Sequence, residues 1–419
     1  MTAPREQSAS PSFRLSTMMF LQFFVLGCTM PIITLYLKEE LDFSGSRIGI
    51  ILAVTSFSAL LSPVIGACVA DRLVSAERLL SLSHLCGAIL LYSLSRQTHF
   101  IPVLLLHLGY WLLIGPSTAL TTAITFHHAP EAVKRFGGIR LWGTLGWIAA
   151  AWVFRFFFVG FASSAGSKDL HGALQLGVWA SLLLGLFSLS IPPGAPKTAV
   201  PVVLFPKESL KIIMSRRVLA FSVMAILISI ADRIYMFGGG PYLKSLGFQD
   251  RNIMPVLSIG QMPEVFGLAI LGTLIIRFGM KKVFLLGAML EIIRFTLFAL
   301  RVPGAPLYFG ISLHGLTYGF FFVTALIFID GNCAASTRSG AHQYFALIVS
   351  GTSALVGNLL AGFVADQARL PSTGAINFPL FWSVPLIFSL AGFFGILFFF
   401  RERGMKVGEQ TTVIEPGMG

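Results

Sequence analysis

The chain has 419 residues, of which 55% are hydrophobic and only 11% are charged, and its mean hydropathy is +0.81. Soluble domains carry about 25% charged residues, so this composition excludes an ordinary soluble protein and indicates an integral membrane protein. The net charge of +12 does not point to a nucleic-acid partner, because the basic residues lie between apolar runs, as the positive-inside rule expects.

Twelve apolar runs follow one another, most of them close to the 20 or so residues that a helix needs to cross a bilayer. The longest polar break, 193–217, divides them six and six. We therefore predict an all-α integral membrane protein with twelve transmembrane helices in two six-helix halves, 1–192 and 218–400, joined by this central loop and followed by a tail, 401–419. The predicted spans are 14–37, 46–70, 78–95, 100–126, 137–161, 172–192, 218–242, 253–276, 282–301, 306–329, 340–364 and 377–400.

The distribution of basic residues predicts the orientation. With the N-terminus inside, 18 of the 30 Lys and Arg residues fall on the cytoplasmic side and 8 on the opposite side. Cytoplasmic loops carry the excess of Lys and Arg in membrane proteins. We therefore expect both termini and the central loop to be cytoplasmic, in the inner (plasma) membrane. The first run, which begins near Arg14, is too long for a signal-peptide core and is predicted to be the first span.

Two turns after the second helix of each half are similar. Gly66–Arg72 ends the second span, and Gly272–Lys282 ends the eighth. Their charges could pair with neighbouring helix ends and hold the cytoplasmic side together. The turns resemble the loop signature of the major facilitator superfamily, and ordinary positively charged turns are the alternative.

The fifth span opens with a polar and aromatic cluster. Arg140 and Thr144 are four residues apart and share a helix face, which Trp147 continues. Gly143 and Gly146 let a neighbouring helix or a ligand approach the backbone. An arginine beside an aromatic ring suits a planar polar solute, whereas an Arg140 that only reaches to the membrane surface is the alternative.

The seventh span carries Asp232 and Arg233 in its middle, followed by Gly238–Pro241, which we expect to break the helix. Neighbours in sequence point about 100° apart on a helix, so the two charges do not simply neutralise each other. One could face a cavity and the other a partner helix, or both could belong to a buried ion-pair network that fixes helix packing.

The eighth span carries Glu264 near mid-depth, where a bare carboxylate costs about 2.5 kcal/mol or more. Gln261 lies one turn away on the same face, and Pro263 loosens the helix between them. An apolar environment favours the neutral form of a carboxyl group. Glu264 could therefore take up a proton on one side of the membrane and release it on the other, and it is the leading proton-site candidate.

Other buried polar residues are expected to be structural. Glu291 and Arg294, three apart in the ninth span, can pair locally. His107 and Tyr110 could touch a cavity but are expected to pack. Asp330, at a helix end, is expected to pair with the turn at Arg338.

Three segments resemble the nucleoside:proton symporters of the major facilitator superfamily: Arg140–Thr144 with its flanks, Gln261–Glu264, and Leu313–Val323 with Asp330 and Arg338 beyond it. The turn from Asp71 to Ala76 is similar as well. The resemblance implies the major facilitator fold and a central nucleoside site. Gly319 stands where family members commonly have an aspartate. The implied site residues are Arg140, Thr144, Trp147, Asp232, Tyr235, Gln261, Glu264, His314, Tyr318 and Phe322.

The chain contains no Walker loop, nucleotide fingerprint or metal-ligand spacing, and its four cysteines suggest neither a disulfide framework nor a zinc site. Uphill transport would therefore draw on an ion gradient. We predict a monomeric proton-coupled symporter that imports nucleosides by alternating access, is no enzyme and uses no cofactor, with Glu264 and Asp232 as proton-coupling candidates.

Three alternatives remain. The first is a carrier of the same fold for a sugar or another small polar or drug-like solute. The second is a receptor that binds its ligand without transporting it. The third is a membrane enzyme, for which His127, His128 and Glu131 are the only candidate cluster.

Overall fold

The computed structural model describes residues 11–58, 74–128, 132–158, 170–193, 206–334 and 337–401. Within these residues the chain is helical, and the only strand-like pairing is an isolated bridge between Arg369 and Ile376. The predicted all-α class is therefore confirmed for the part of the chain that is described. The turn containing Asp71 and Arg72, and Glu131 of the candidate enzyme cluster, lie outside it.

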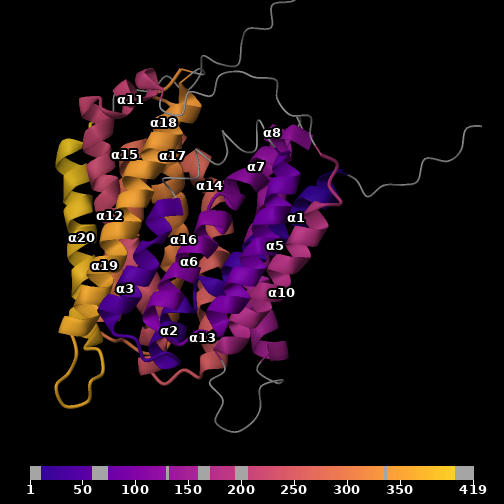
Figure 1. The fold of residues 1–419 in the computed structure, drawn as a ribbon. Coiled ribbons are helices and arrows are strands. Elements are labelled where there is room, and N and C mark those ends of the chain that lie inside the picture. The colour runs from indigo at the N-terminus through magenta and orange to yellow at the C-terminus, as the bar shows by residue number, and fades with distance from the viewer. Residues whose placement is uncertain are drawn as a thin grey trace, which may run out of the picture.

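The first group of helices is drawn in colours from indigo through purple to the magenta of α10 in Figure 1. Its members are α1 (Pro11–Thr29), α2 (Ile33–Glu39), α3 (Gly45–Ala53), α5 (Ala76–Ser95), α6 (Phe100–Ile114), α7 (Ser117–His128), α8 (Ala132–Val153) with the π-helical turn η2 (Phe154–Phe158), and α10 (His171–Ser188).

The second group follows the central loop. Its members are α11 (Lys207–Ile213), α12 (Arg216–Ser245), α13 (Asp250–Ser258), the 3₁₀ turn η3 (Ile259–Gln261), α14 (Met262–Phe278), α15 (Met280–Ala299), α16 (Ala305–Thr317), the π-helical η4 (Tyr318–Val323), α17 (Thr324–Asp330), α18 (Arg338–Phe345), the π-helical η5 (Ala346–Gly351), α19 (Thr352–Gln367) and α20 (Phe378–Phe399).

Nine helical segments of the described residues are long and apolar enough to cross a membrane, so the chain is a multi-pass membrane protein. Helices α8 and α15 also reach the length, with 22 and 20 residues, but each contains at least three charged residues. The nine segments are Ser12–Glu39, Ala76–Ser95, Phe100–His128, His171–Ser188, Arg216–Ser245, Asp250–Phe278, Ala305–Asp330, Arg338–Gln367 and Phe378–Phe399.

The eighth predicted span is interrupted where its proline predicts a loosened helix. The regular helix α13 ends at Ser258, the turn Ile259–Gln261 winds more tightly, and α14 begins at Met262 with Pro263 in its first turn. Proline lacks the N–H that a continuous helix would use at this point. The prediction is confirmed, and the interruption places Gln261 in a turn between two helices.

The break predicted at Gly238–Pro241 is wrong. Helix α12 continues without interruption from Arg216 to Ser245, with Pro241 inside it. Pro241 removes one backbone hydrogen bond, the one its missing N–H would make to the residue four positions earlier, and the helix continues past it. Gly238 packs against the rings of Phe381 and Trp382, so the glycines serve close packing and the neighbouring helix holds the backbone in place.

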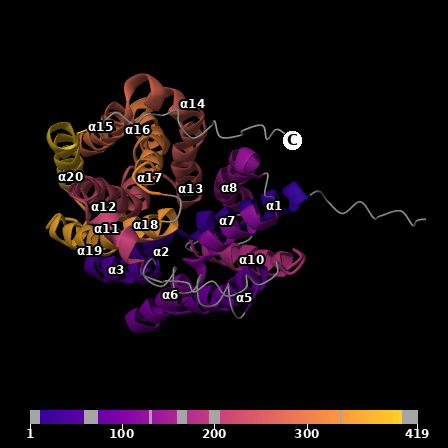
Figure 2. The same cartoon turned by 90° about the horizontal axis from the view of Figure 1, so that it is seen from above.

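The two groups lie side by side (Figures 1 and 2). In the first, α1 packs against α8 and α10, and α5 packs against α6 and α10. In the second, α12 packs against α19 and α20, and α15 packs against α16 and α20. The groups meet where α2 contacts α12, α3 contacts α19, and α8 contacts α13.

These contacts between the groups gather towards one end of the bundle. Figure 1 shows α2 and α13 at the bottom and α11 at the top, and we call these the α13 end and the α11 end. At the α13 end a Cβ on Gly49 of α3 would meet the backbone of Asn358 and Gly362 of α19, so the two helices touch backbone to backbone. The Arg155 guanidinium of η2 also donates to the Asn252 side chain of α13.

An aspartate completes this contact. Asp366, near the end of α19, accepts hydrogen bonds from the backbone N–H groups of Gly45 and Ser46, each at 2.7 Å. The first N–H groups of a helix have no partner within the helix, and their partial positive charge favours an anion. A carboxylate from the second group therefore caps a helix of the first group.

Candidate functional site

Four of the predicted site residues line one pocket between the two groups. Trp147 of α8 faces Tyr235 of α12, Gln261 of η3 and His314 of α16 across it. The backbone of Gly260, beside Gln261, packs closely on His314. The pocket therefore contains an aromatic ring from the first group and an amide, an imidazole and a phenol from the second. Such side chains can stack on a planar polar solute and form hydrogen bonds with it.

Arg140 lies on α8, seven residues before Trp147. Its guanidinium carbon is 4.0 Å from the centre of the Phe23 ring of α1, a cation–π contact. It also interacts with the Tyr318 side chain and electrostatically with Glu264. Phe23 was not among the sequence predictions, because nothing in α1 marks one phenylalanine above the others.

Glycines allow this arrangement. A Cβ on Gly146 would meet the backbone of Phe20, so α1 and α8 approach closely, as the glycine spacing predicts. Thr144 is only 7% exposed and lies within α8. It shares a helix with Arg140 but does not line the pocket that contains Trp147.

Glu264 is 6% exposed and lies in the first turn of α14. It interacts electrostatically with Arg140 and His314, so its carboxylate is directed into the protein and not towards lipid. A Cβ on Gly315 of α16 would meet the Glu264 backbone N, which shows how tightly α14 and α16 pack here. The structure thus brings the predicted acid, arginine and histidine together from three helices.

A second cavity, of about 300 Å³, opens from Asp232 along η4, α17 and η5. Tyr318 and Phe322 form part of its wall, with their ring centres 6.1 Å apart. Tyr318 is 37% exposed, so its ring is available to a solute in this cavity. Both rings belong to the π-helical segment η4, and such segments occur frequently at functional sites.

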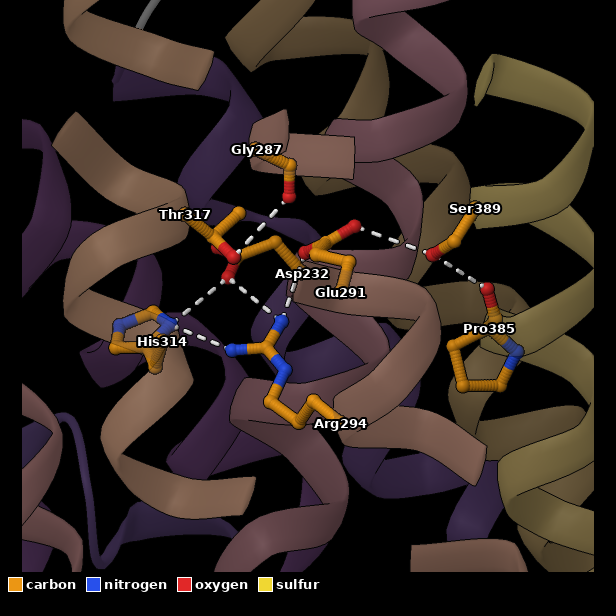
Figure 3. Close-up of polar contacts among 8 residues, drawn as sticks. All are labelled: Asp232, Gly287, Glu291, Arg294, His314, Thr317, Pro385 and Ser389. Atoms are coloured by element: carbon orange, nitrogen blue, oxygen red, sulfur yellow. Dashed lines mark hydrogen bonds and ion pairs between the residues drawn. The ribbon is translucent and has the colours of Figure 1, made fainter. Parts of the chain in front are cut away.

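Asp232 belongs to a buried charged cluster that Figure 3 shows in full. Arg294 Nη2 lies 2.7 Å from Glu291 Oε1 and 3.8 Å from Asp232 Oδ1. Arg294 Nη1 lies 2.9 Å from His314 Nδ1. The predicted local pair of Glu291 and Arg294 is therefore confirmed, and the pair additionally reaches two candidate site residues on other helices.

Glu291 and Arg294 were predicted to be structural and not part of the site. The available signal was two opposite charges in the middle of an apolar run, where each is expensive unless it has a partner. Both side chains are completely buried. Their position one turn apart on α15 explained them locally and gave no reason to look for partners on α12 or α16.

A third cavity, of about 50 Å³, lies on another side of α12. It is lined by His107 and Tyr110 of α6, Thr34 of α2, Asn358 of α19 and Arg233 of α12. His107 Nε2 and Thr34 Oγ1 are buried and have no hydrogen-bond partner among the described residues. Arg233 lines both this cavity and the 300 Å³ cavity, whereas Asp232 lines the 300 Å³ cavity and contacts Arg294 and His314 of the charged cluster.

Gly319 faces α14, and a Cβ there would make ordinary contact with Leu268 at 3.6 Å. Asp232 instead points to Arg294 and His314. The acid on α12 therefore lies against different helices from the position that Gly319 occupies.

The remaining candidates are accounted for by local pairs. Asp330 contacts Arg338 at 3.3 Å and His342 at 2.6 Å, as predicted for this turn. His128 pairs with Glu77 at 2.8 Å. In the part of the chain that the structure describes, no group of three or more His, Cys, Asp or Glu is arranged to hold a metal ion.

Comparison with known proteins identifies the family. Residues 9–404 match the family model described as "Nucleoside H+ symporter". The chain is 30% identical over 410 residues to the putative nucleoside transporter YegT of Escherichia coli, covering 94% of this chain and 95% of the relative. It is 25% identical over 428 residues to the nucleoside permease NupG of the same organism, covering 96% and 98%.

The fold has a solved counterpart. The crystal structure of nucleoside transporter NupG superposes with a TM-score of 0.81 at 23% sequence identity, covering 94% of this chain and 100% of that chain. The relatives carry the names of transporters and permeases and not of enzymes. Because the family model matches nearly the whole sequence, the chain belongs to the nucleoside H+ symporter family.

Proposed function

We propose that this protein imports nucleosides together with protons by alternating access. The observation that carries the proposal is the meeting of Arg140, Glu264 and His314, from three helices, beside a pocket that also contains Trp147 and Gln261. A buried carboxyl group next to a cation and a solute pocket can couple proton binding to solute binding. Family membership supports nucleosides as the solute and protons as the coupled ion.

The proposed architecture is the major facilitator fold with twelve spans. Its halves are residues 1–192 and 218–400, with 193–217 as the cytoplasmic central loop and 401–419 as the cytoplasmic tail. Each of the twelve predicted runs contains a described helix, which supports the count. The excess of basic residues supports cytoplasmic termini in the inner membrane, so the α11 end faces the cytoplasm. We propose that the protein acts as a monomer.

This orientation suggests which state the structure represents. The contacts between the groups, through α2, α3 and α13, lie at the end that would face outwards. The 300 Å³ cavity that begins at Asp232 extends along η4, α17 and η5 towards the α11 end. We therefore propose that the outer side is closed and that the solute would leave towards the cytoplasm.

Each site residue has a proposed role. Arg140 and Thr144 position the solute, and Gln261 hydrogen-bonds to it. Trp147, Tyr235, Tyr318 and Phe322 supply ring faces for the base, and His314 supplies a further polar contact. Aromatic stacking favours a flat base over a sugar alone, and hydrogen bonds from the amide and the guanidinium fix the orientation of the solute.

Glu264 takes the coupling proton, with Asp232 as a second proton-coupling residue. Protonation removes the cost of carrying a bare charge through an apolar constriction, so the two halves can rock around a neutral site. Energy comes from the proton gradient, and no cofactor is required.

Uptake into proteoliposomes tests the proposal. Purified protein should accumulate labelled uridine or adenosine when the outside is acidic, and a protonophore should abolish the accumulation. Unlabelled nucleosides should compete, whereas sugars should not. Accumulation that is equal with and without a proton gradient, or competition by sugars alone, would contradict the proposal.

A further inference from the structure

Four ionisable side chains, Asp232, Glu291, Arg294 and His314, are enclosed between α12, α15 and α16 (Figure 3). We propose that Asp232 and His314 share one proton, separate from the proton on Glu264, and that Glu291 and Arg294 set the affinity for it. The role of this proton in transport rests on the proposed function.

The charge count of the cluster leaves room for one proton. With His314 neutral, Arg294 contributes one positive charge, and Asp232 and Glu291 contribute one negative charge each. The sum is one negative charge, in a place where Arg294 and Glu291 are completely buried and His314 is 7% exposed. An uncompensated buried charge is costly, so binding one proton neutralises the cluster and is favoured.

The hydrogen bonds show where this proton fits. His314 Nδ1 lies 2.9 Å from Arg294 Nη1 and 3.4 Å from Asp232 Oδ1. Arginine can only donate, so Nδ1 carries no hydrogen while it is bonded to Arg294. It then has nothing to donate to Asp232, whose Oδ1 is buried and accepts no hydrogen bond from any described residue. A proton on Nδ1 or on Oδ1 would supply the missing bond between them. Because Nδ1 has a single lone pair in the ring plane, this bond replaces the one from Arg294 Nη1.

Both carboxyl oxygens of Glu291 are occupied by hydrogen-bond donors. One of its oxygens accepts from Arg294 Nη2 at 2.7 Å, and the other accepts from the Ser389 hydroxyl of α20 at 3.1 Å. A proton on Glu291 would displace one of these donors, whereas Asp232 Oδ1 has no hydrogen bond to lose among the described residues. The proton therefore belongs to the pair of Asp232 and His314, and it is shared between them as in other strongly coupled groups.

The pair connects the two cavities of the site. Asp232 lines the 300 Å³ cavity, from which a proton can arrive, while His314 lines the pocket that contains Gln261. The other charged or titratable groups near the pair are Arg233 and Tyr235 on α12, Tyr318 on η4, Glu264 on α14 and Arg140 on α8. A positive charge on His314 therefore interacts electrostatically with Glu264 and with a solute in the pocket.

Substitution of Glu291 tests the affinity. Glu291→Gln removes a negative charge without touching either group that binds the proton, so proton binding weakens. We expect the pH midpoint of nucleoside uptake to move by about one pH unit to lower pH, a ten-fold loss of proton affinity. Glu291→Asp keeps the charge and should restore the wild-type profile. A profile of Glu291→Gln that coincides with that of the wild type would overturn the proposal.

A second measurement counts the protons. Calorimetry of nucleoside binding in buffers of different ionisation enthalpy, just above the wild-type pH midpoint, should give about one proton fewer for Asp232→Asn than for the wild type. Asp330→Asn is the matched control, because it removes the carboxylate of another Asp–His pair, 2.6 Å from His342 and outside the cluster.

Unchanged proton numbers in Asp232→Asn overturn the shared proton even if Glu291→Gln fails to fold. They leave proton-driven uptake by the wild type intact, so the two proposals fail separately. Absence of any nucleoside binding by the wild type would instead remove the proposed function, and with it the role given to this proton in transport.

Discussion

Asp366 near the end of α19 caps Ser46 at the start of α3, accepting from its backbone N–H at 2.7 Å and from its hydroxyl at 2.6 Å. The two residues are 320 positions apart and belong to different groups of helices. The hydrogen bonds exist only while these groups touch at the α13 end. This carboxylate therefore stabilises one conformation of the carrier over others.

Removing the Asp366 carboxylate should weaken closure at the α13 end. Leaving buried donors without a partner costs about 1–3 kcal/mol, so Asp366→Ala should shift the population towards separation of α3 and α19. Double electron–electron resonance between spin labels on Thr98 and Thr373, in the loops of the two groups at this end, should show longer distances in Asp366→Ala than in the wild type. Arg369→Ala is the control, because it removes a partner of Asp366 at 3.3 Å within the second group and leaves the hydrogen bonds from Gly45 and Ser46 to Asp366 in place. Equal shifts in both variants would show that the cap is not the cause.

Filling the contact between α3 and α19 should stop transport. A side chain at Gly49 would meet the backbone of Asn358, which cannot move aside. Overpacking costs about 1–3 kcal/mol, so Gly49→Leu should lower nucleoside uptake about ten-fold or more without loss of expression. Gly272→Leu is the matched control, because a Cβ on this helical glycine meets no described atom within 4 Å. Normal uptake by Gly49→Leu would mean that α3 need not touch α19 during the cycle.

The ring of Phe23 should support solute binding through Arg140. Phe23→Leu removes the cation–π contact, worth about 0.5–2 kcal/mol, and leaves the guanidinium free to change orientation. The expected result is a several-fold rise in KM for nucleoside uptake with a smaller change in maximal rate. Phe13→Leu makes the same substitution on the same helix at a side chain that is 62% exposed, and it should have no effect. Equal KM values for both variants would mean that Phe23 does not contribute to solute binding.

Local features of the sequence predicted local features of the structure. The pair Glu291–Arg294 lies within one helical turn, and the interruption at Gln261 follows from the proline beside it, so neither depends on how helices pack. The spacing of Gly143 and Gly146 also predicted one packing feature, a close helix approach, because a helix face without side chains lets another helix come near.

Other features that depend on helix packing were not predicted. The contact of Arg294 with His314 needs α15 and α16 at particular rotations, and the cap of Ser46 by Asp366 needs the two groups to meet. The continuity of α12 through Pro241 also depends on neighbours, because Phe381 and Trp382 pack against its glycines. Local propensity is overridden by tertiary packing at such places.

The most direct test of the account concerns Glu264, whose buried carboxyl group faces Arg140 and His314. Glu264→Gln keeps the size and a hydrogen-bonding head group but cannot exchange a proton. The variant should still exchange labelled for unlabelled nucleoside across the membrane, because exchange needs no net proton movement.

The deciding measurement is nucleoside accumulation by proteoliposomes under an inward proton gradient, made with wild-type protein and Glu264→Gln side by side. If Glu264 carries the coupling proton, the wild type accumulates nucleoside and the variant only equilibrates it. Accumulation by Glu264→Gln to the wild-type level would contradict this role.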